Sequence, residues 1–474
     1  MPDQTSEPPP KHAPPDIPAR LWCVAAIIGA GAFLAMMDST VINLAVGDID
    51  TTFGLAMDGE CGADLSCNWS PGILAVSCYL LAMAISLPLT GWLGNCFGNV
   101  RLWRATLITF LIGSLVCAIA PNAFFLIAGR IAQGLSAGMM IPVGQVLLRR
   151  MTGPDQLGRI MGSVGFAVAL GPALGPAFGG WLIETFSWRW VFWLNIPVGG
   201  IALMGAGFLS NGQVGAKQDR RFDGWGYCVL AGGLLSVLGG AILAEQRKFV
   251  ALGLVMIAAG SLMLVRFFRK TGTHQCNLID PAVLGNAWFR AGFVASGMTA
   301  MNMYGGLLFL PIFLGNMSGF GLEEVGGLLF FLGIGAALAL PVCGMLCDRL
   351  GAGRVLVWGA LLLSIDTAAL MVLGDSGFGM LAGLLMLRGA GLALAQMPAV
   401  TGAYIAVDKA DMGDAATLIN LIQRVGGCVG VAVIAMIIAW VTGPVSMAGL
   451  TFLLLLSVAT ITPAVGMMRA DRFV

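Results

Sequence analysis

Gly91-Trp-Leu-Gly-Asn-Cys-Phe-Gly-Asn-Val-Arg101 recurs 253 residues later as Gly344-Met-Leu-Cys-Asp-Arg-Leu-Gly-Ala-Gly-Arg354. Both copies keep the pattern G-x-L-x-(N/D)-x-x-G-x-x-R, and each joins two long apolar segments. Duplicated helical units with a polar hairpin at matching places are typical of secondary transporters. The sequence therefore predicts a duplicated, all-α integral membrane protein. The loop-motif positions are Gly91, Asn95, Gly98, Arg101, Gly344, Asp348, Arg349, Gly351 and Arg354.

The composition supports a membrane protein. Only 10% of the residues are charged, 58% are hydrophobic and the mean hydropathy is +0.89. A soluble domain carries about 25% charged residues, so this chain has too few charged residues to form the water-exposed surface of a soluble protein. No basic tract suggests a nucleic acid partner. We interpret the Pro-rich residues 1–20 as a disordered cytoplasmic tail and not as a signal peptide.

Long apolar segments follow one another along the whole chain. A helix needs about 20 apolar residues to cross a bilayer, and fourteen segments of the sequence reach that length. The candidate spans are approximately 21–47, 70–92, 102–120, 123–148, 160–184, 189–209, 224–244, 249–268, 289–315, 324–347, 354–373, 378–406, 413–441 and 446–468.

The distribution of Lys and Arg predicts the orientation. With a cytoplasmic amino terminus, 19 of the 25 basic residues fall in cytoplasmic segments, 3 in outer segments and 3 inside spans. The first outer loop, residues 48–69, is acidic. An even number of spans places both termini in the cytoplasm. We expect a six-helix unit at 21–209, an inserted helix pair at 222–268 and a second six-helix unit at 289–468.

Several further motifs follow the hairpin in order along the chain, and together they point to one family. They are Met37-Asp38-Ser-Thr-Val-Ile-Asn43-Leu-Ala45, Arg130-Ile-Ala-Gln133-Gly134, Gly171-Pro172-Ala-Leu-Gly175-Pro176-Ala-Phe-Gly179-Gly180, and Trp188-Arg189-Trp190-Val-Phe192-Trp-Leu-Asn195-Ile-Pro197-Val-Gly199. With the hairpin, these segments resemble the 14-helix drug:proton antiporters of the major facilitator superfamily, the EmrB/QacA type, and most closely the EmrB branch. The resemblance implies the major facilitator fold and export driven by protons across a bacterial inner membrane.

Asp38 is the residue to which we give most weight. A carboxylate inside a span is costly unless it faces water or a partner, so it is a candidate functional group. A carboxyl group tuned by burial and by a nearby cation can exchange a proton near neutral pH. The alternative is that Asp38 caps or packs a helix end.

Arg130 is the natural partner of Asp38. Counted from Asp48 and from Pro121 at the outer ends of their spans, both residues lie roughly 14 Å below the outer surface. Equal depth permits an ion pair that proton binding can bias between two states. Arg130 could equally be a structural strut that bonds backbone carbonyls.

Other polar residues inside spans are expected to face a substrate cavity, because lipid would penalise them. Asp366 could be a second proton site or could pair with a neighbouring helix, and we favour pairing. The cavity residues that we expect are Asn43, Gln133, Gln145, Arg388, Gln396, Asn420, Gln423 and Arg424.

The span-five motif is uncharged and is expected to act mechanically. Its glycines let helices approach closely, and its prolines kink the helix. We expect it at the interface between the two bundles. Its positions are Gly171, Pro172, Gly175, Pro176, Gly179 and Gly180.

The two hairpins differ at one position. Asn95 stands where the second copy has Asp348, and an asparagine can only hydrogen-bond. In the outer loop, Cys61 and Cys67 could form a disulfide or stay as two unpaired thiols. We found no nucleotide-binding, nucleophile or metal-ligand motif, so the sequence predicts neither an enzyme nor a cofactor.

The function that the sequence favours is proton-coupled efflux of hydrophobic small molecules by alternating access. A symporter or importer of the same fold and a transport-inactive membrane sensor are the alternatives. The expected partners are the substrate, protons and the lipid bilayer. Relatives of the EmrB branch also work with a periplasmic adaptor and an outer-membrane channel, which we would expect to contact residues 48–69.

Overall fold

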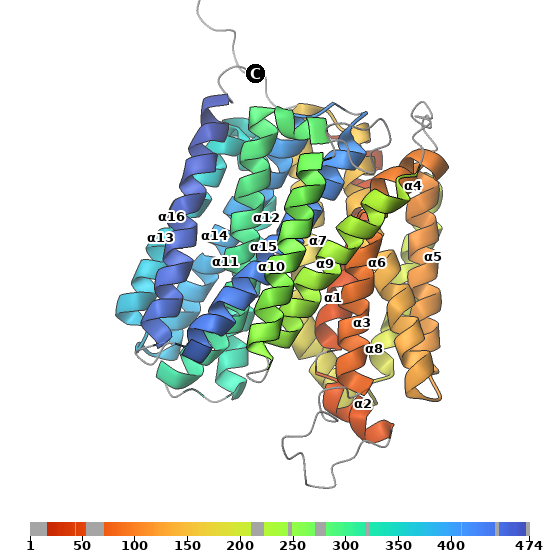
Figure 1. Cartoon of the computed structure of the whole chain (residues 1–474), viewed down its shortest axis with the longest axis horizontal. Coiled ribbons are helices and arrows are strands. Elements are labelled where there is room, and N and C mark those ends of the chain that lie inside the picture. Colours follow the sequence, from red (N-terminus) through yellow and green to blue (C-terminus); the bar gives the residue numbers. More distant parts are fainter. Residues whose placement is uncertain are drawn as a thin grey trace, which may run out of the picture.

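The chain folds into a bundle of long helices that run side by side (Figure 1). The computed structural model describes residues 17–42, 44–53, 71–209, 222–244, 249–270, 281–317, 320, 322–408, 410–440 and 445–470. The helices are α1 (Ala19–Val41), α2 (Val46–Thr52), α3 (Pro71–Ser86), α4 (Leu89–Phe97), α5 (Asn99–Ala118), α6 (Ala123–Met151), α7 (Pro154–Thr185), α8 (Trp190–Gly205), η2 (Ala206–Phe208), α9 (Gly224–Ala244), α10 (Val250–Lys270), η4 (Pro281–Gly285), α11 (Ala287–Met317), α12 (Leu322–Leu350), α13 (Ala352–Leu373), α14 (Phe378–Ile405), α15 (Met412–Trp440) and α16 (Val445–Ala470).

Most of these helices can span a membrane. Within the described residues, eleven are long and apolar enough, and a bent pair of helices raises the number to twelve. The chain is therefore a multi-pass helical membrane protein. The count of fourteen spans stays a prediction, since α7 and α9 are not among the helices that meet this criterion within the described part of the chain.

The second predicted span is not one straight helix. It is broken between α3 and α4, which meet at an angle of 60°. Pro88 lies at the break. Proline lacks an amide hydrogen and disfavours the helical conformation of the residue before it, here Leu87, so the helix stops and restarts. The sequence analysis also missed the short helix α2, which begins just after the end of the first membrane helix.

The two loop motifs have the same backbone geometry. Gly98 and Gly351 are the two described glycines with positive φ, at 85° and 89°, and each is the N-cap of the next helix. Only glycine adopts such a conformation without strain, which explains the shared position in both copies. We call the end of the bundle that carries these two glycines the hairpin end, and the opposite end the α2 end.

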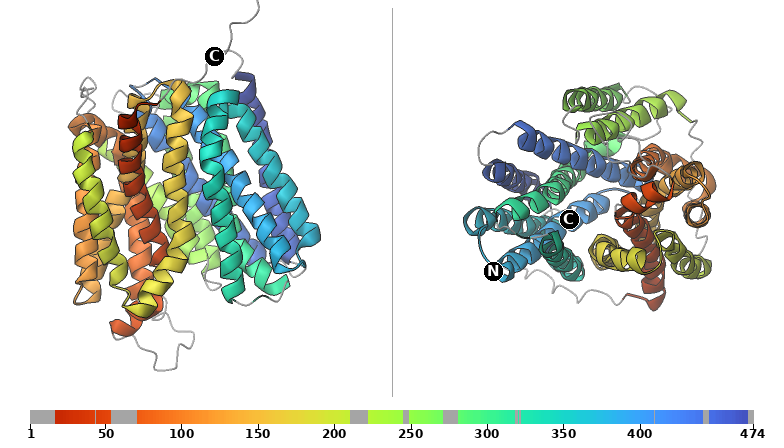
Figure 2. Two further views of the ribbon diagram at one scale, coloured as in Figure 1. Left: turned by 180° about the vertical axis from the view of Figure 1, so that it is seen from behind. Right: turned by 90° about the horizontal axis from the view of Figure 1, so that it is seen from below.

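The helices gather in two groups, with α9 and α10 at their common edge (Figure 2). In the first group, α1 packs against α6, α7 and α8, and α6 packs against α3 and α5. In the second group, α11 packs against α14, α15 and α16, and α14 packs against α12 and α13. The α9–α10 pair contacts α3 of the first group and α15 of the second. The domain division proposed from the sequence stays a prediction, and its bounds at 21, 268, 289 and 468 fall two residues inside α1, α10, α11 and α16.

The two groups touch mainly through α7 against α12 and through α6 against α15. Small residues allow the first contact. A Cβ atom added to Gly158 would lie 2.7 Å from the Gly344 carbonyl oxygen, and one added to Gly162 would lie 2.9 Å from the Leu340 oxygen. Backbones this close leave no room for a side chain, as at other small-residue interfaces in membranes.

Candidate functional site

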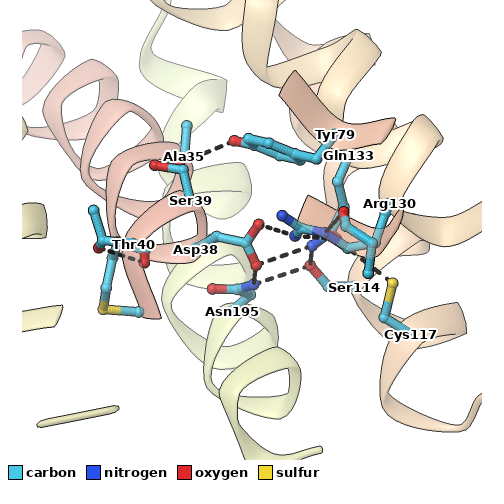
Figure 3. Close-up of polar contacts among 12 residues, drawn as sticks. Ala35, Asp38, Ser39, Thr40, Tyr79, Ser114, Cys117, Arg130, Gln133 and Asn195 are labelled. Carbon is cyan, nitrogen blue, oxygen red and sulfur yellow. Dashed lines mark hydrogen bonds and ion pairs between the residues drawn. The ribbon is translucent and has the colours of Figure 1, made fainter. Parts of the chain in front are cut away.

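Asp38 and Arg130 form a buried ion pair between α1 and α6 (Figure 3). The Arg130 Nη1 group donates to Asp38 Oδ2, and both side chains are 0% exposed. The pairing suggested by their equal depth is therefore present. Both residues lie in the half of the bundle toward the α2 end, because Asp38 comes three residues before the end of α1 and Arg130 seven after the start of α6.

The Asp38 carboxylate is held by more than the arginine. Its Oδ1 atom accepts from Asn195 Nδ2 at 3.0 Å and from Gln133 Nε2 at 3.3 Å. Both amides also donate to the Ser114 hydroxyl, at 3.1 and 2.7 Å, so α5, α6 and α8 all fix the site. Donors from two helices besides α1 therefore converge on this one carboxylate.

Arg130 has partners beyond Asp38. Its Nε donates to the Ala75 carbonyl at 3.1 Å and its Nη1 to Gln133 Oε1 at 2.9 Å. The guanidinium carbon lies 4.1 Å from the centre of the Tyr79 ring, a distance suited to a cation–π contact. Its Nη2 is buried without a partner among the described residues. The cation thus keeps several contacts if Asp38 becomes neutral, although removing the charge of one partner from a buried pair remains costly.

Helix α7 positions α1. A Cβ atom added to Gly171 would lie 2.8 Å from Met36 Cβ, and one added to Gly179 would lie 2.3 Å from Val41 Cγ1. These two glycines of the span-five motif therefore bring α7 against the turn that carries Asp38. The prediction that the motif lies between the two bundles is wrong for these residues. Earlier glycines of the same helix make that interface, because they lie nearer the hairpin end.

Two of the expected cavity residues are buried inside their own helix groups. Gln133 belongs to the Asp38 network and is 0% exposed. Arg388 is 1% exposed and pairs with Asp366 at 3.3 Å. A buried arginine must have its charge compensated, so Arg388 turns toward Asp366 and not toward an open surface. The pairing that we favoured for Asp366 is confirmed.

Gln145 and Asn420 link the two groups of helices. Gln145 Oε1, on α6, accepts from Asn420 Nδ2 on α15 and from the Tyr404 hydroxyl on α14, each at 2.9 Å. On the same helix, Arg149 Nε donates to the Tyr404 carbonyl oxygen at 3.1 Å. In this conformation, Gln145 and Asn420 therefore join the bundles near the hairpin end.

The remaining expected cavity residues lie together in the second group. Gln396 and Gln423 both donate to the Ser296 hydroxyl, at 3.1 and 2.9 Å, and Gln396 Oε1 is buried without a partner in the described part of the chain. Arg424, on α15 of the same group, is partly exposed.

At the hairpin end, Asp348 of the second loop motif ties α12 to α7. It accepts from the amides of Gly158 and Arg159, at 2.9 and 3.1 Å, and from Arg159 Nε at 3.1 Å. A carboxylate at a helix N-terminus is favoured by the helix dipole. Arg101, Arg349 and Arg354 are exposed, and Asn95 makes no hydrogen bond with the described residues.

The sequence analysis missed three members of the network around Asp38: Ser114, Asn195 and Tyr79. Asn195 lies inside the quoted W-R-W motif, so its intramembrane amide was an available signal. Ser114 and Tyr79 carry no such signal, because single hydroxyl groups are common in spans.

Some predicted residues cannot be placed. Asn43, Cys61 and Cys67 lie outside the described residues, as does most of the loop 48–69. Pro172, Gly175, Pro176 and Gly180 belong to α7, but their surroundings are outside what the structure describes. Within the described residues, no group of three or more His, Cys, Asp or Glu side chains could hold a metal ion.

Comparison with known proteins places the chain among transporters. A family model described as Major Facilitator Superfamily matches residues 28–431. The multidrug resistance protein B homolog of Mycobacterium tuberculosis is 30% identical over 422 residues, which cover 88% of this chain and 76% of that protein. The puromycin resistance protein pur8 of Streptomyces alboniger is 28% identical over 423 residues, covering 88% of this chain and 81% of its own.

Two solved structures share the fold. The human organic anion transporter MFSD10 (TETRAN) superposes with a TM-score of 0.67 at 17% identity, covering 94% of this chain and 100% of its own. The proton:xylose symporter XylE superposes with a TM-score of 0.64 at 14% identity, covering 95% and 96%. At such low identities, these likenesses concern the fold alone.

Proposed function

The chain belongs to the major facilitator superfamily, a family of membrane transporters and not of enzymes, and we propose that it is a proton-coupled exporter of hydrophobic small molecules. The observation that carries the proposal is the buried Asp38–Arg130 pair between α1 and α6. A buried carboxylate inside a helical membrane bundle is a functional group by default. The finer assignment is to the 14-helix drug:proton antiporters of the EmrB/QacA type.

In the proposed cycle, Asp38 exchanges a proton for its bond to Arg130. The carboxylate is ionised while Asn195, Gln133 and Arg130 donate to it. When α1 and α6 shift relative to each other, these donors separate and the carboxyl group takes up a proton instead. Binding of the proton thereby biases the equilibrium between two arrangements of the helices.

The conformation in hand supports alternating access with one end closed. The inter-bundle polar contacts described above are those of Asp348 with α7, of Gln145 with α14 and α15, and of Arg149 with α14, and they all lie toward the hairpin end. We place this end in the cytoplasm, since the positive-inside rule assigns it most of the basic residues. With that orientation, we propose a state closed toward the cytoplasm, whose opening requires these bonds to break.

Hydrophobic drugs are the proposed substrates. Relatives over most of the chain bear the names multidrug resistance protein and puromycin resistance protein. The two glutamines Gln396 and Gln423 and the partly exposed Arg424 would supply polar contacts for neutral or weakly acidic compounds. The proposed location is the bacterial inner membrane. An adaptor, if one is used, would contact residues 48–69.

The experiment that tests this function uses everted membrane vesicles with an established pH gradient. Addition of puromycin should release protons from vesicles that contain the protein, and should not do so from vesicles that contain Asp38→Asn. Uptake of protons together with the substrate would indicate a symporter, and no proton movement with any lipophilic compound would indicate a transport-inactive protein.

A further inference from the structure

A second buried ion pair lies in the second group of helices. Asp366 of α13 and Arg388 of α14 are 2% and 1% exposed, and Arg388 Nη1 donates to Asp366 Oδ2 at 3.3 Å. Arg388 also donates to the Thr367 hydroxyl at 3.0 Å and to Asn302 Oδ1 at 2.8 Å. The mechanism proposed above makes no use of this pair.

The second pair repeats the layout of the first. In each group, the arginine comes from the fourth helix, α6 or α14, and a hydroxyl group comes from the third. These hydroxyls are Ser114 and Thr367, which are separated by the same 253 residues as the two loop motifs. In each group, the first helix and the sixth also contribute polar side chains: Asp38 and Asn195 in one, Asn302 and Ser457 in the other.

The position of the carboxylate is what differs. In the first group it stands on the first helix, α1, and in the second group on the third, α13. On α11, which is the counterpart of α1, the residue bonded to the buried arginine is Asn302 and not an aspartate. Its amide donates to Ser457 and to the Leu453 carbonyl, each at 2.9 Å. Duplication has thus preserved a buried arginine network in both halves while each half carries its own titratable group.

Asp366 is held far less firmly than Asp38. Its Oδ2 accepts one long hydrogen bond, and its Oδ1 is buried without a partner among the described residues. A buried charged oxygen without a donor is unfavourable by the full desolvation penalty. Protonation removes this penalty, and Arg388 then keeps its bonds to Thr367 and Asn302. The ionised pair leaves one oxygen without a donor, whereas protonation leaves Arg388 without its counter-charge, so each state carries a penalty that the other avoids.

The charges around Asp366 are few. Helices α12, α14 and α16 pack against α13. Their charged residues other than Arg388 lie near helix ends, and Arg388 is the charged group that acts on Asp366 within the described part of the chain. The residues near helix ends are Glu323, Glu324, Asp348, Arg349 and Arg469, and α13 itself adds Arg354.

We propose that Asp366 binds a second coupling proton in exchange for its bond to Arg388. The proton adds to a carboxylate oxygen and forms an O–H bond, the Arg388 hydrogen bond breaks, and Arg388 stays charged. This inference rests on the proposed function, because it assigns two protons to one transport cycle of the same exporter. It assigns a proton-binding role to the C-terminal half, in addition to the role proposed for Asp38 in the N-terminal half.

The first test measures protonation without transport. Infrared difference spectra of the purified full chain, taken between mildly alkaline and mildly acidic pH, report protonated carboxyl groups through their C=O stretching bands. Asp366→Asn should remove one buried carboxyl band, whereas Asp375→Asn, which changes an exposed carboxylate just beyond the end of α13, should leave that band in place. Identical buried-carboxyl bands in the wild-type protein and in Asp366→Asn would overturn the proposal.

Asp366→Asn leaves Arg388 without its counter-charge and so can lower stability. The double variant Asp366→Asn with Arg388→Gln removes both charges and provides a neutral reference that should also lack the band. If the single variant does not fold, the double variant decides the question with the same readout. A band that survives in the double variant would equally overturn the proposal.

The second test measures the coupling ratio in proteoliposomes with the membrane potential clamped. Each proton per cycle multiplies the limiting puromycin gradient by about tenfold per pH unit of gradient. At a gradient of one pH unit, Asp366→Asn should therefore lower the limiting puromycin gradient by about tenfold while transport continues. An unchanged limiting gradient would overturn the proposal. If the wild-type protein does not transport puromycin, the proposed function fails, but the infrared band still tests whether Asp366 binds a proton. Failure of the proposed function and failure of this inference are therefore distinguishable.

Discussion

The two halves of the molecule each bury one aspartate against one arginine, but the two pairs are built to different strengths. Asp38 accepts from Arg130, Asn195 and Gln133, whereas among the described residues Asp366 accepts one bond, from Arg388 at 3.3 Å. In each half the arginine comes from the fourth membrane span and the hydroxyl from the third. The difference teaches that duplication preserved the scaffold of the site, while the number of donors on each carboxylate was free to change.

The two hairpins differ in the same way. Asp348 in the second hairpin accepts three bonds from the start of α7. In the first hairpin Asn95 makes no such bond with the described residues. The buried carboxylate near this hairpin belongs to the second group of helices: it is Asp414, in the first turn of α15, whose Oδ1 lies 3.2 Å from where a Cβ on Gly91 would lie. The two hairpins thus share their backbone conformation but differ in charge, because the first has Asn95 where the second has Asp348.

The largest effect is expected from Asp38→Asn. Asparagine has nearly the same shape and keeps hydrogen-bonding groups, but it cannot titrate. Efflux of puromycin driven by a pH gradient should fall to the background of empty proteoliposomes, while puromycin counterflow without a gradient persists. Asp48→Asn, which changes an exposed carboxylate in α2, is the control and should retain full efflux. Gradient-driven efflux at the wild-type rate would remove Asp38 from the coupling mechanism.

Glycine-to-alanine changes behind α1 and behind α11 should have a smaller effect, and they distinguish loss of helix packing from loss of proton coupling. Gly179→Ala would place Cβ 2.3 Å from Val41 Cγ1 behind α1, and Gly430→Ala would place it 2.2 Å from the Met301 carbonyl oxygen behind α11. Overpacking of this kind costs about 2 kcal/mol, so both variants should lower the melting temperature in detergent.

Only Gly179→Ala displaces the helix that carries Asp38, so it should reduce coupled efflux more than Gly430→Ala does. Gly200→Ala and Gly383→Ala meet open space and serve as controls that should not destabilise the protein. Equal losses of coupling from the two packing variants would mean that both halves carry the coupling equally.

The two hairpins can be compared directly with Asp348→Asn. Loss of the charge should weaken the closed hairpin end by about 1.5 kcal/mol, or roughly tenfold in population, because charge-assisted hydrogen bonds become neutral ones. Spin labels on Cys96 and on Arg349→Cys, in a chain without other cysteines, would report a longer mean distance between the hairpins.

In the first hairpin, Asn95→Gln changes no charge and should leave that distance unaltered. A closed hairpin end that is equally populated in the wild-type protein and in Asp348→Asn would show that the α7–α12 glycine packing alone holds it.

The smallest effect concerns the matched hydroxyls. Ser114 accepts from Gln133 and Asn195, whereas Thr367 accepts from Arg388 alone. Ser114→Ala should lower the free energy of unfolding by about 1 kcal/mol, more than Thr367→Val does. The reason is that the first change removes the acceptor of two buried donors, whereas the second removes the acceptor of one. Thermal unfolding followed by a thiol-reactive dye measures both. A larger loss for Thr367→Val would reverse the ranking of the two networks.

The membrane class, the duplication and the candidate ion pair could all be predicted from the order of residues along the chain. Apolar length and charge distribution depend only on composition along the chain, and a repeated turn needs glycine at the same place, as Gly98 and Gly351 confirm. Equal depth in two spans was enough to predict that Asp38 and Arg130 could meet, because helical rise is constant.

The partners of each buried charge, by contrast, could not be predicted and depend on how the helices pack. Arg388 turned out to face Asp366 and not a cavity, Gln145 and Asn420 joined the two halves, and Gly171 and Gly179 supported α1 and not the bundle interface. Each of these outcomes depends on how a helix is rotated about its axis and on which neighbour it meets. A uniformly apolar span hides that rotation, because lipid-facing and protein-facing surfaces are composed of the same residues.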